Sequence, residues 1–262
     1  MDRADTLAVL RRGDAARALP KLGGMARPNG VFIVSERFWA FANVDGTVRE
    51  GRMPTPPEAL QRIPLARGLV RLYASLSPLF RRTSVTPRRE RLALLAAVLA
   101  PFALIFLPGG WSTPAGAGIT IALLALLLRG RALNLHGAEH RAIAAAEERR
   151  LLETWTGVAR PSRFSERCGT NFSAIAIPVT LGVDRLWPLS PALYTPAVLL
   201  TLALALSMEL WLLVQRGPSL LRRVVLAPGL LLQRLTTREP RLDETHLALA
   251  AVAAVLRREL AA

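Results

Sequence analysis

The chain has 262 residues, of which 52% are hydrophobic, and its mean hydropathy is +0.31, whereas soluble domains of this length are usually less apolar. The net charge of +15 comes almost entirely from arginine, since Lys21 is the only lysine among 34 basic residues. The arginines flank apolar runs, which favours membrane lipids over nucleic acid as the partner. The single cysteine, Cys168, excludes an internal disulfide, and the first thirty residues contain no apolar core of signal-peptide length.

Residues 1–90 are predicted to form a cytoplasmic or interfacial region. Two β-branched or aromatic runs flank Asp45-Gly46, a favoured hairpin turn, so we expect a small β-hairpin there, outside the membrane. The segment 59–76 places its apolar residues on one helical face and its arginines on another. This pattern indicates an amphipathic helix at the membrane interface, or alternatively a helix that binds a protein partner.

Four apolar segments follow within residues 91–215, at 92–108, 115–128, 172–189 and 192–214. A membrane-spanning helix needs about 20 residues, a length that the first and last segments approach or exceed. The third segment carries two charges near its end, which makes it the weakest candidate for a membrane span among the four. We therefore expect a mainly α polytopic membrane protein with about four spanning helices.

Arginines orient these segments. They are dense before the first, between the second and third, and after the fourth, and sparse in the other two connections. Counting positive charge as cytoplasmic predicts a multi-pass protein of the bacterial inner membrane with both termini and residues 129–170 in the cytoplasm. Residues 216–262 then form a cytoplasmic C-terminal region, and its tail, 243–260, has the pattern of a helix.

Two of the three histidines, His136 and His140, stand four residues apart with Glu139 between them. On a helix these imidazoles share a face and can bind one transition metal. H-x-x-E-H is also an inverted zincin pattern, in which the glutamate acts as general base. The alternative is a polar helix end in which the same groups only form hydrogen bonds.

Two further residues are candidates for the same site. Glu209 lies inside the last apolar segment, where an ionisable group is costly without a partner, so it is either a third ligand or the structural partner of Arg141 or another arginine. Cys168, in RCGTNF, offers a thiolate that could ligate zinc, although a lone cysteine near an interface is more often a passive small residue.

The blocks HGAEHRAI, RCGTNF, PGLLLQRLTTREP and RIPLARGLVRLYASL together resemble the YqhQ-like membrane proteins, also described as domain of unknown function 1385. The resemblance covers roughly residues 22–260. It implies a metal-dependent membrane protein whose polar positions are His136, Glu139, His140, Cys168 and Glu209. The chain departs from the family at Ser165-Glu166, where His-Pro is usual, and its N-terminal block is shortened to GGMARPNGV.

Two functional hypotheses of different classes follow. The first is a metal-dependent hydrolase at the cytoplasmic face, with a divalent transition metal, zinc first, bound by His136 and His140 and completed by Glu209 or Cys168. Glu139 is then the general base. The second is a non-catalytic membrane scaffold or assembly factor, whose polar cluster only locks helices together.

Overall fold

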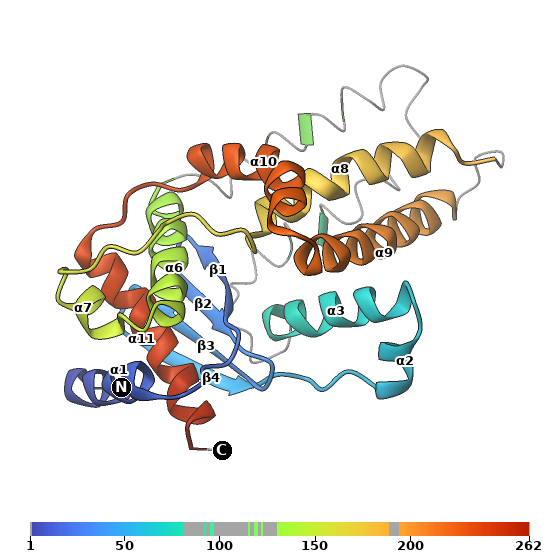
Figure 1. The fold of residues 1–262 in the computed structure, drawn as a ribbon. Coiled ribbons are helices and arrows are strands. Elements are labelled where there is room, and N and C mark those ends of the chain that lie inside the picture. Colours follow the sequence, from blue (N-terminus) through green and yellow to red (C-terminus); the bar gives the residue numbers. More distant parts are fainter. Residues whose placement is uncertain are drawn as a thin grey trace. The chain divides into compact units, whose positions relative to one another are not determined.

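The structure is a computed structural model that describes residues 2–80, 130–188 and 194–261 together with isolated positions between 92 and 122 (Figure 1). The chain forms two compact units, each built from separate stretches of sequence. We call them the sheet unit (Met1–Thr55, Leu127–Arg167 and Leu230–Ala262) and the helical unit (Pro56–Leu126 and Cys168–Gly229).

An antiparallel sheet of four strands is the frame of the sheet unit. The strands follow one another in the order β1 (Gly23–Arg27), β2 (Gly30–Val34), β3 (Phe38–Asn43) and β4 (Val48–Arg52). The turn between β3 and β4 holds Gly46 at a φ of +86°, and the Asp45 carboxylate accepts hydrogen bonds from the backbone N–H and hydroxyl of Thr47. The predicted hairpin is confirmed, and two more strands extend it.

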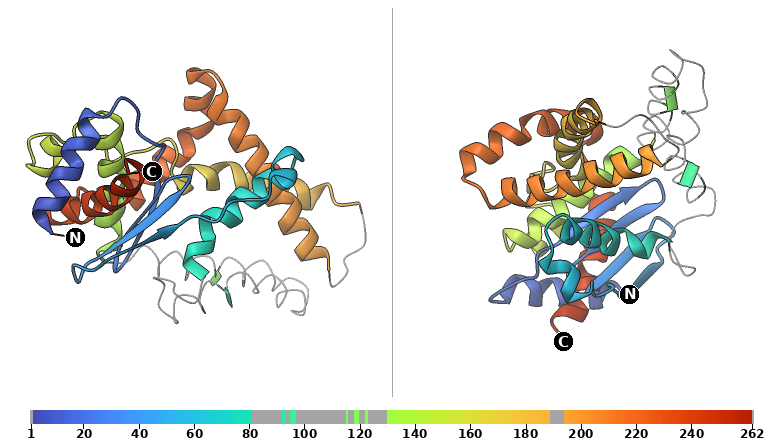
Figure 2. Two further views of the ribbon diagram at one scale, coloured as in Figure 1. Left: turned by 90° about the horizontal axis from the view of Figure 1, so that it is seen from below. Right: turned by 90° about the vertical axis from the view of Figure 1, so that its right-hand side faces the viewer.

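Two long helices, α6 (Ala132–Glu147) and α11 (Leu242–Glu259), pack on each other and on the sheet (Figure 1). Side chains alternate between the faces of a strand, and every second residue of β2 and β3 joins the core with these helices. The shorter helices α1 (Arg3–Ala15) and α7 (Leu151–Trp155) pack against α11 (Figure 2). The predicted C-terminal helix is confirmed by α11.

The helical unit contains α2 (Glu58–Arg62), α3 (Ala66–Phe80), α8 (Gly169–Arg185), α9 (Thr195–Arg216) and most of α10 (Ser219–Thr236). Phe172 near the start of α8 contacts Trp211 near the end of α9, so these two helices run antiparallel. Helix α3 packs on α9, where a Cβ at Gly68 would lie 2.5 Å from the Cβ of Met208. The predicted helix at 59–76 is thus two helices, interrupted at Leu65, whose φ is +67°.

The prediction of about four spanning helices is wrong. Within the described ranges one helix, α9 with 22 residues, is long and apolar enough to cross a membrane. Helix α8, in the place of the third predicted span, has 17 residues and ends at Arg185, short of the roughly 20 that a bilayer requires. The first two predicted spans, 92–108 and 115–128, lie outside the described residues apart from single positions.

Candidate metal centre

Helix α6 carries His136, Glu139 and His140, and the two imidazole rings lie 4.5 Å apart between centroids. Gly137 is what lets the segment before α11 come close to this face. A Cβ at Gly137 would lie 2.1 Å from the carbonyl oxygen of Arg238, which leaves no room for any other residue. The adjacent backbone N–H of Arg238 donates to the carbonyl of Leu133 at 3.0 Å, which fixes the segment against α6.

Both imidazoles are held in one tautomer. Nδ1 of His136 lies 2.9 Å from the carbonyl oxygen of Thr236, and Nδ1 of His140 lies 2.8 Å from that of Arg163. A carbonyl oxygen only accepts, so each Nδ1 carries a proton, and Nε2 is the nitrogen of each ring that is left to bind a metal. Metal-binding histidines commonly use this arrangement, because the carbonyl bond orients the ring and makes the ligand nitrogen more basic.

Cys168 completes a group of three ligand atoms. It follows Arg167, the last residue of a sheet-unit segment, and is the N-cap of α8, where its Sγ accepts hydrogen bonds from the backbone N–H and hydroxyl of Thr170 at 3.5 and 3.3 Å. The ligand atoms of His136, His140 and Cys168 all lie within 4.8 Å of one another, close to the roughly 3–4 Å between ligands of one zinc ion. Two imidazoles and a thiolate suit zinc, so this group could hold a metal ion.

Glu139 lies on the neighbouring face of α6 and is 4% exposed. Burial raises its pKa to about 7, against the lowering effects of the electrostatic interaction with His136 and of a hydrogen bond from the backbone N–H of Ala26 on β1. Gly24, also on β1, makes room for the carboxyl group, since a Cβ there would lie 2.7 Å from Oε1 of Glu139. The Gly23-Gly24 pair was the signal in the sequence for this contact, which sequence reasoning missed.

Glu209 takes part in a different contact. Its carboxylate accepts hydrogen bonds from Arg67 and from the backbone N–H of Leu65, all within the helical unit. The Glu209 side chain is 15% exposed and that of Arg67 is 32% exposed, so the pair is partly shielded from water. The group of three ligand atoms does not include Glu209, and its role as a metal ligand stays a prediction.

Arg141, the other partner considered for Glu209, is paired elsewhere. It donates through Nε to the carbonyl of Pro161 at 3.1 Å and forms a 2.9 Å ion pair with Glu239, which Arg163 also contacts at 3.0 Å. The segment LTTREP, residues 235–240, therefore contacts α6 at three places, through the Thr236 carbonyl, the Arg238 backbone and the Glu239 carboxylate. These contacts hold the segment before α11 against α6.

Comparison with known proteins places the chain in a family. The family model described as "Protein of unknown function (DUF1385)" matches residues 121–258, a range that contains all three ligand residues. "Uncharacterized protein YqhQ" of Bacillus subtilis (strain 168) is 32% identical over 133 residues, which are 49% of this chain and 42% of that relative. No solved structure matches the chain. The family match covers more than half of the sequence, and the chain belongs to this DUF1385 family of proteins of unknown function.

Proposed function

We propose that this chain is a membrane-attached, metal-dependent enzyme of hydrolytic type, with zinc held by His136, His140 and Cys168. The observation that supports it most is the pair of imidazoles, each with its proton fixed on Nδ1 and each contributing a ligand atom to a group within 4.8 Å. Three protein ligands leave one position open in a tetrahedral site, as catalytic zinc sites do, whereas structural zinc sites usually have four. When bound, zinc acts as a Lewis acid and makes water a stronger nucleophile near neutral pH.

Glu139 is the general base in this proposal. A base works best when its pKa is near the working pH, and burial brings the pKa of Glu139 to about 7. The hydrogen bond from Ala26 and the space left by Gly24 hold the carboxyl group in one place on the sheet. Glu139 would take a proton from the attacking water, while His136 and His140 keep their own protons on Nδ1, donated to the carbonyls of Thr236 and Arg163.

Attachment to the membrane is the second part of the proposal. Helix α9 has the length and composition of a span, and 22% of its most apolar stretch is buried within the protein, unlike the core helix of a soluble domain. Helix α10 exposes Leu220, Val224 and Leu235 together with Arg223, a composition that suits an interface with anionic lipid. The arginine-rich segments beside the metal centre favour its location at the cytoplasmic face.

A scaffold function is the second candidate, and one observation favours it. The polar groups of α6 join separate segments of the sheet unit: His136 contacts Thr236, His140 contacts Arg163, and Glu139 contacts β1. Such contacts stabilise a fold without any metal. In this reading the protein is a non-catalytic assembly factor, and the cluster only holds its helices and sheet together.

Metal analysis of the full chain, purified in detergent without chelators, tests the proposal. We expect about one zinc ion per chain, with C168S and H140Q each lowering zinc affinity at least about tenfold. H246Q is the matched control, because His246 is the third histidine and stacks on Trp155 outside the ligand group. Thermal melting of each variant shows that it is folded. Loss of zinc in H246Q as well, or a metal-free wild type that cannot be loaded with zinc, would contradict the proposed metal site and favour the scaffold function.

The E139Q variant tests the role of Glu139 as general base separately from the binding of zinc by its ligands. It should retain zinc with wild-type affinity and lose hydrolysis of any ester, amide or phosphoester substrate that the wild type turns over. An E139Q variant as active as the wild type would remove Glu139 from the mechanism, and a wild type that binds zinc but hydrolyses none of these substrates would point to a structural metal.

A further inference from the structure

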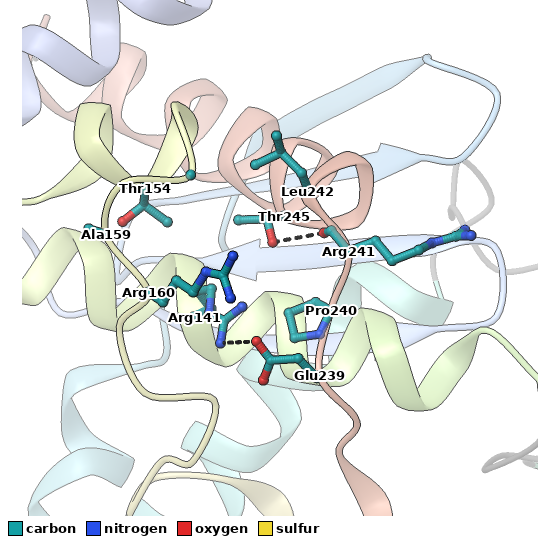
Figure 3. Close-up of a pocket in the computed structure, with 10 residues that line it drawn as sticks. Arg141, Thr154, Ala159, Arg160, Glu239, Pro240, Arg241, Leu242 and Thr245 are labelled. Carbon is teal, nitrogen blue, oxygen red and sulfur yellow. Dashed lines mark hydrogen bonds and ion pairs between the residues drawn. The ribbon is translucent and has the colours of Figure 1, made fainter.

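A cavity of about 230 Å³ lies inside the sheet unit, apart from the three ligand residues. Its walls come from α6, α7, the turn after α7, residues 239–241 and the start of α11 (Figure 3). The lining is apolar at Ala159, Pro240 and Leu242. The hydroxyl groups of Thr154 and Thr245 donate hydrogen bonds to the backbone carbonyls of Arg150 and Arg241. The charged groups of the cavity are therefore what decides which ligand fits.

Positive charge exceeds negative charge around this cavity. Arg141 and Arg160 direct their guanidinium groups into the same part of it, and Glu239 points at Arg141 (Figure 3). The Arg141 side chain is 9% exposed, and its Nε is anchored on the carbonyl of Pro161. Arg160 has no ion pair with any residue that the structure describes. The cavity thus contains two arginines but one carboxylate, and that carboxylate pairs with Arg141.

A third arginine, Arg163, adds positive charge next to the cavity. Arg163 contacts the same Glu239 carboxylate at 3.0 Å, and its Nε is buried without an acceptor among the described residues. Burial alone would raise the pKa of Glu239, but the hydrogen bonds and charges of Arg141 and Arg163 outweigh it and hold that pKa below its usual value. Three guanidinium groups with one carboxylate leave donors and positive charge for a further anion.

The geometry points to a binding site for a small molecule that carries a phosphate or carboxylate group. Arg141 and Arg160 bind the oxyanion through paired N–H donors, and Ala159, Pro240 and Leu242 contact the remainder of the ligand. Arg241 takes no part, because its side chain points away from the cavity and pairs with Asp243 and Glu244 (Figure 3). Glu239 is the internal anion against which the ligand competes for Arg141.

The size of the cavity selects the kind of ligand. Drug-sized ligands occupy pockets of about 300–1,000 Å³, so a cavity of about 230 Å³ takes a smaller molecule, an oxyanion with a short carbon skeleton. Arg141, at 9% exposure, lies too deep for a flat macromolecular surface to reach. The site is independent of the metal proposal, because none of its lining residues is a proposed ligand.

Thermal melting of the full chain in detergent, after chelation of metals with EDTA, tests this site. Inorganic phosphate should raise the melting temperature in a saturable way, whereas chloride at the same ionic strength should not. Acetate, in a parallel series, distinguishes a carboxylate ligand from a phosphate one. Chelation ensures that phosphate acts on the arginines and not on a bound metal ion, so the result does not depend on the proposed function.

Two variants with opposite effects identify the residues. R160Q should weaken phosphate binding about tenfold by removing charge-assisted hydrogen bonds. R11Q is its matched control, an exposed arginine on α1 outside the cavity, and should bind like the wild type. E239Q should bind phosphate more tightly, because it removes the competing carboxylate. Equal binding by wild type, R160Q and E239Q, or no saturable effect of phosphate or acetate on the wild type, would overturn the proposal.

Discussion

Gly137 shows how one residue controls the candidate site. It lies between His136 and Ala138 on α6, where the backbone carbonyl of Arg238 packs directly against the helix. Glycine lowers helix propensity, so a glycine in the middle of a buried helix has a cost that a close contact must offset. Here the contact holds the segment that supplies the Thr236 carbonyl to His136.

We expect G137A to lower stability by about 1–3 kcal/mol or more, because the added methyl group overlaps the Arg238 carbonyl. Zinc binding should weaken in parallel, since the carbonyl that fixes His136 has to move. G182A on α8 is the control. No described atom lies within 4 Å of a Cβ there, and alanine should stabilise that helix by up to ~1 kcal/mol. Chemical unfolding of both variants measures the difference, and a G137A protein as stable as G182A would contradict the crowding.

At the scale of elements, the contact between α3 and α9 depends on a pair that the sequence only half identifies. An ionisable group in the apolar stretch of α9 called for a partner, and the structure supplies Arg67 at the start of α3. Arg67 binds the Glu209 carboxylate through Nε and Nη2, while the turn at Leu65 donates its backbone N–H to the same group. A carboxylate with three donors fixes where α3 begins against α9.

A double-mutant cycle on R67Q and E209Q measures this pair. Each single change should lower the melting temperature of the full chain, and the double variant should lose clearly less than the sum, because either change already breaks the pair. The matched control cycle is R62Q with E58Q on α2, an ion pair at 4.0 Å whose side chains are more than 80% exposed. That cycle should show almost no coupling. Additive losses at Arg67 and Glu209 would mean that other contacts hold α3 in place.

At the scale of the whole molecule, the two units do not follow chain order. The sheet unit takes its residues from both ends and the middle of the sequence, and the helical unit takes the stretches between them. Helix α9 is the element of the described chain with the composition of a membrane span. The proposed attachment to a membrane requires that the exposed side chains of α9 face lipid and not water.

L206R tests that environment. Leu206, at the middle of α9, is 37% exposed, so an arginine there meets the surroundings of the helix. In a bilayer the change costs about 2.5–3.5 kcal/mol and should reduce the amount of protein in carbonate-washed membranes. V158R is the control, at a residue of the sheet unit that is 77% exposed, and should leave membrane association unchanged. If L206R and V158R fractionate alike, α9 lies in water or in a protein contact.

Local chemistry let the sequence determine several features by itself. Asp45-Gly46 specified the β3–β4 hairpin because few other residues adopt that turn, and the i, i+4 spacing put His136 and His140 on one face of a helix. The motif blocks also identified the family. Each of these depends on residues a few positions apart, whose relative geometry the backbone fixes before any tertiary contact forms.

Tertiary structure decided the rest, because it joins residues far apart in the chain. Hydropathy predicted about four spans, but it measures only how apolar a segment is, and α8 proved shorter than a span. No local pattern gave Arg67 as the partner of Glu209, 142 positions away, or Thr236 as the acceptor for His136, 100 positions away. Nor did any local pattern indicate that Glu139 is buried beside Gly24 of β1, and that burial raises its pKa to about 7.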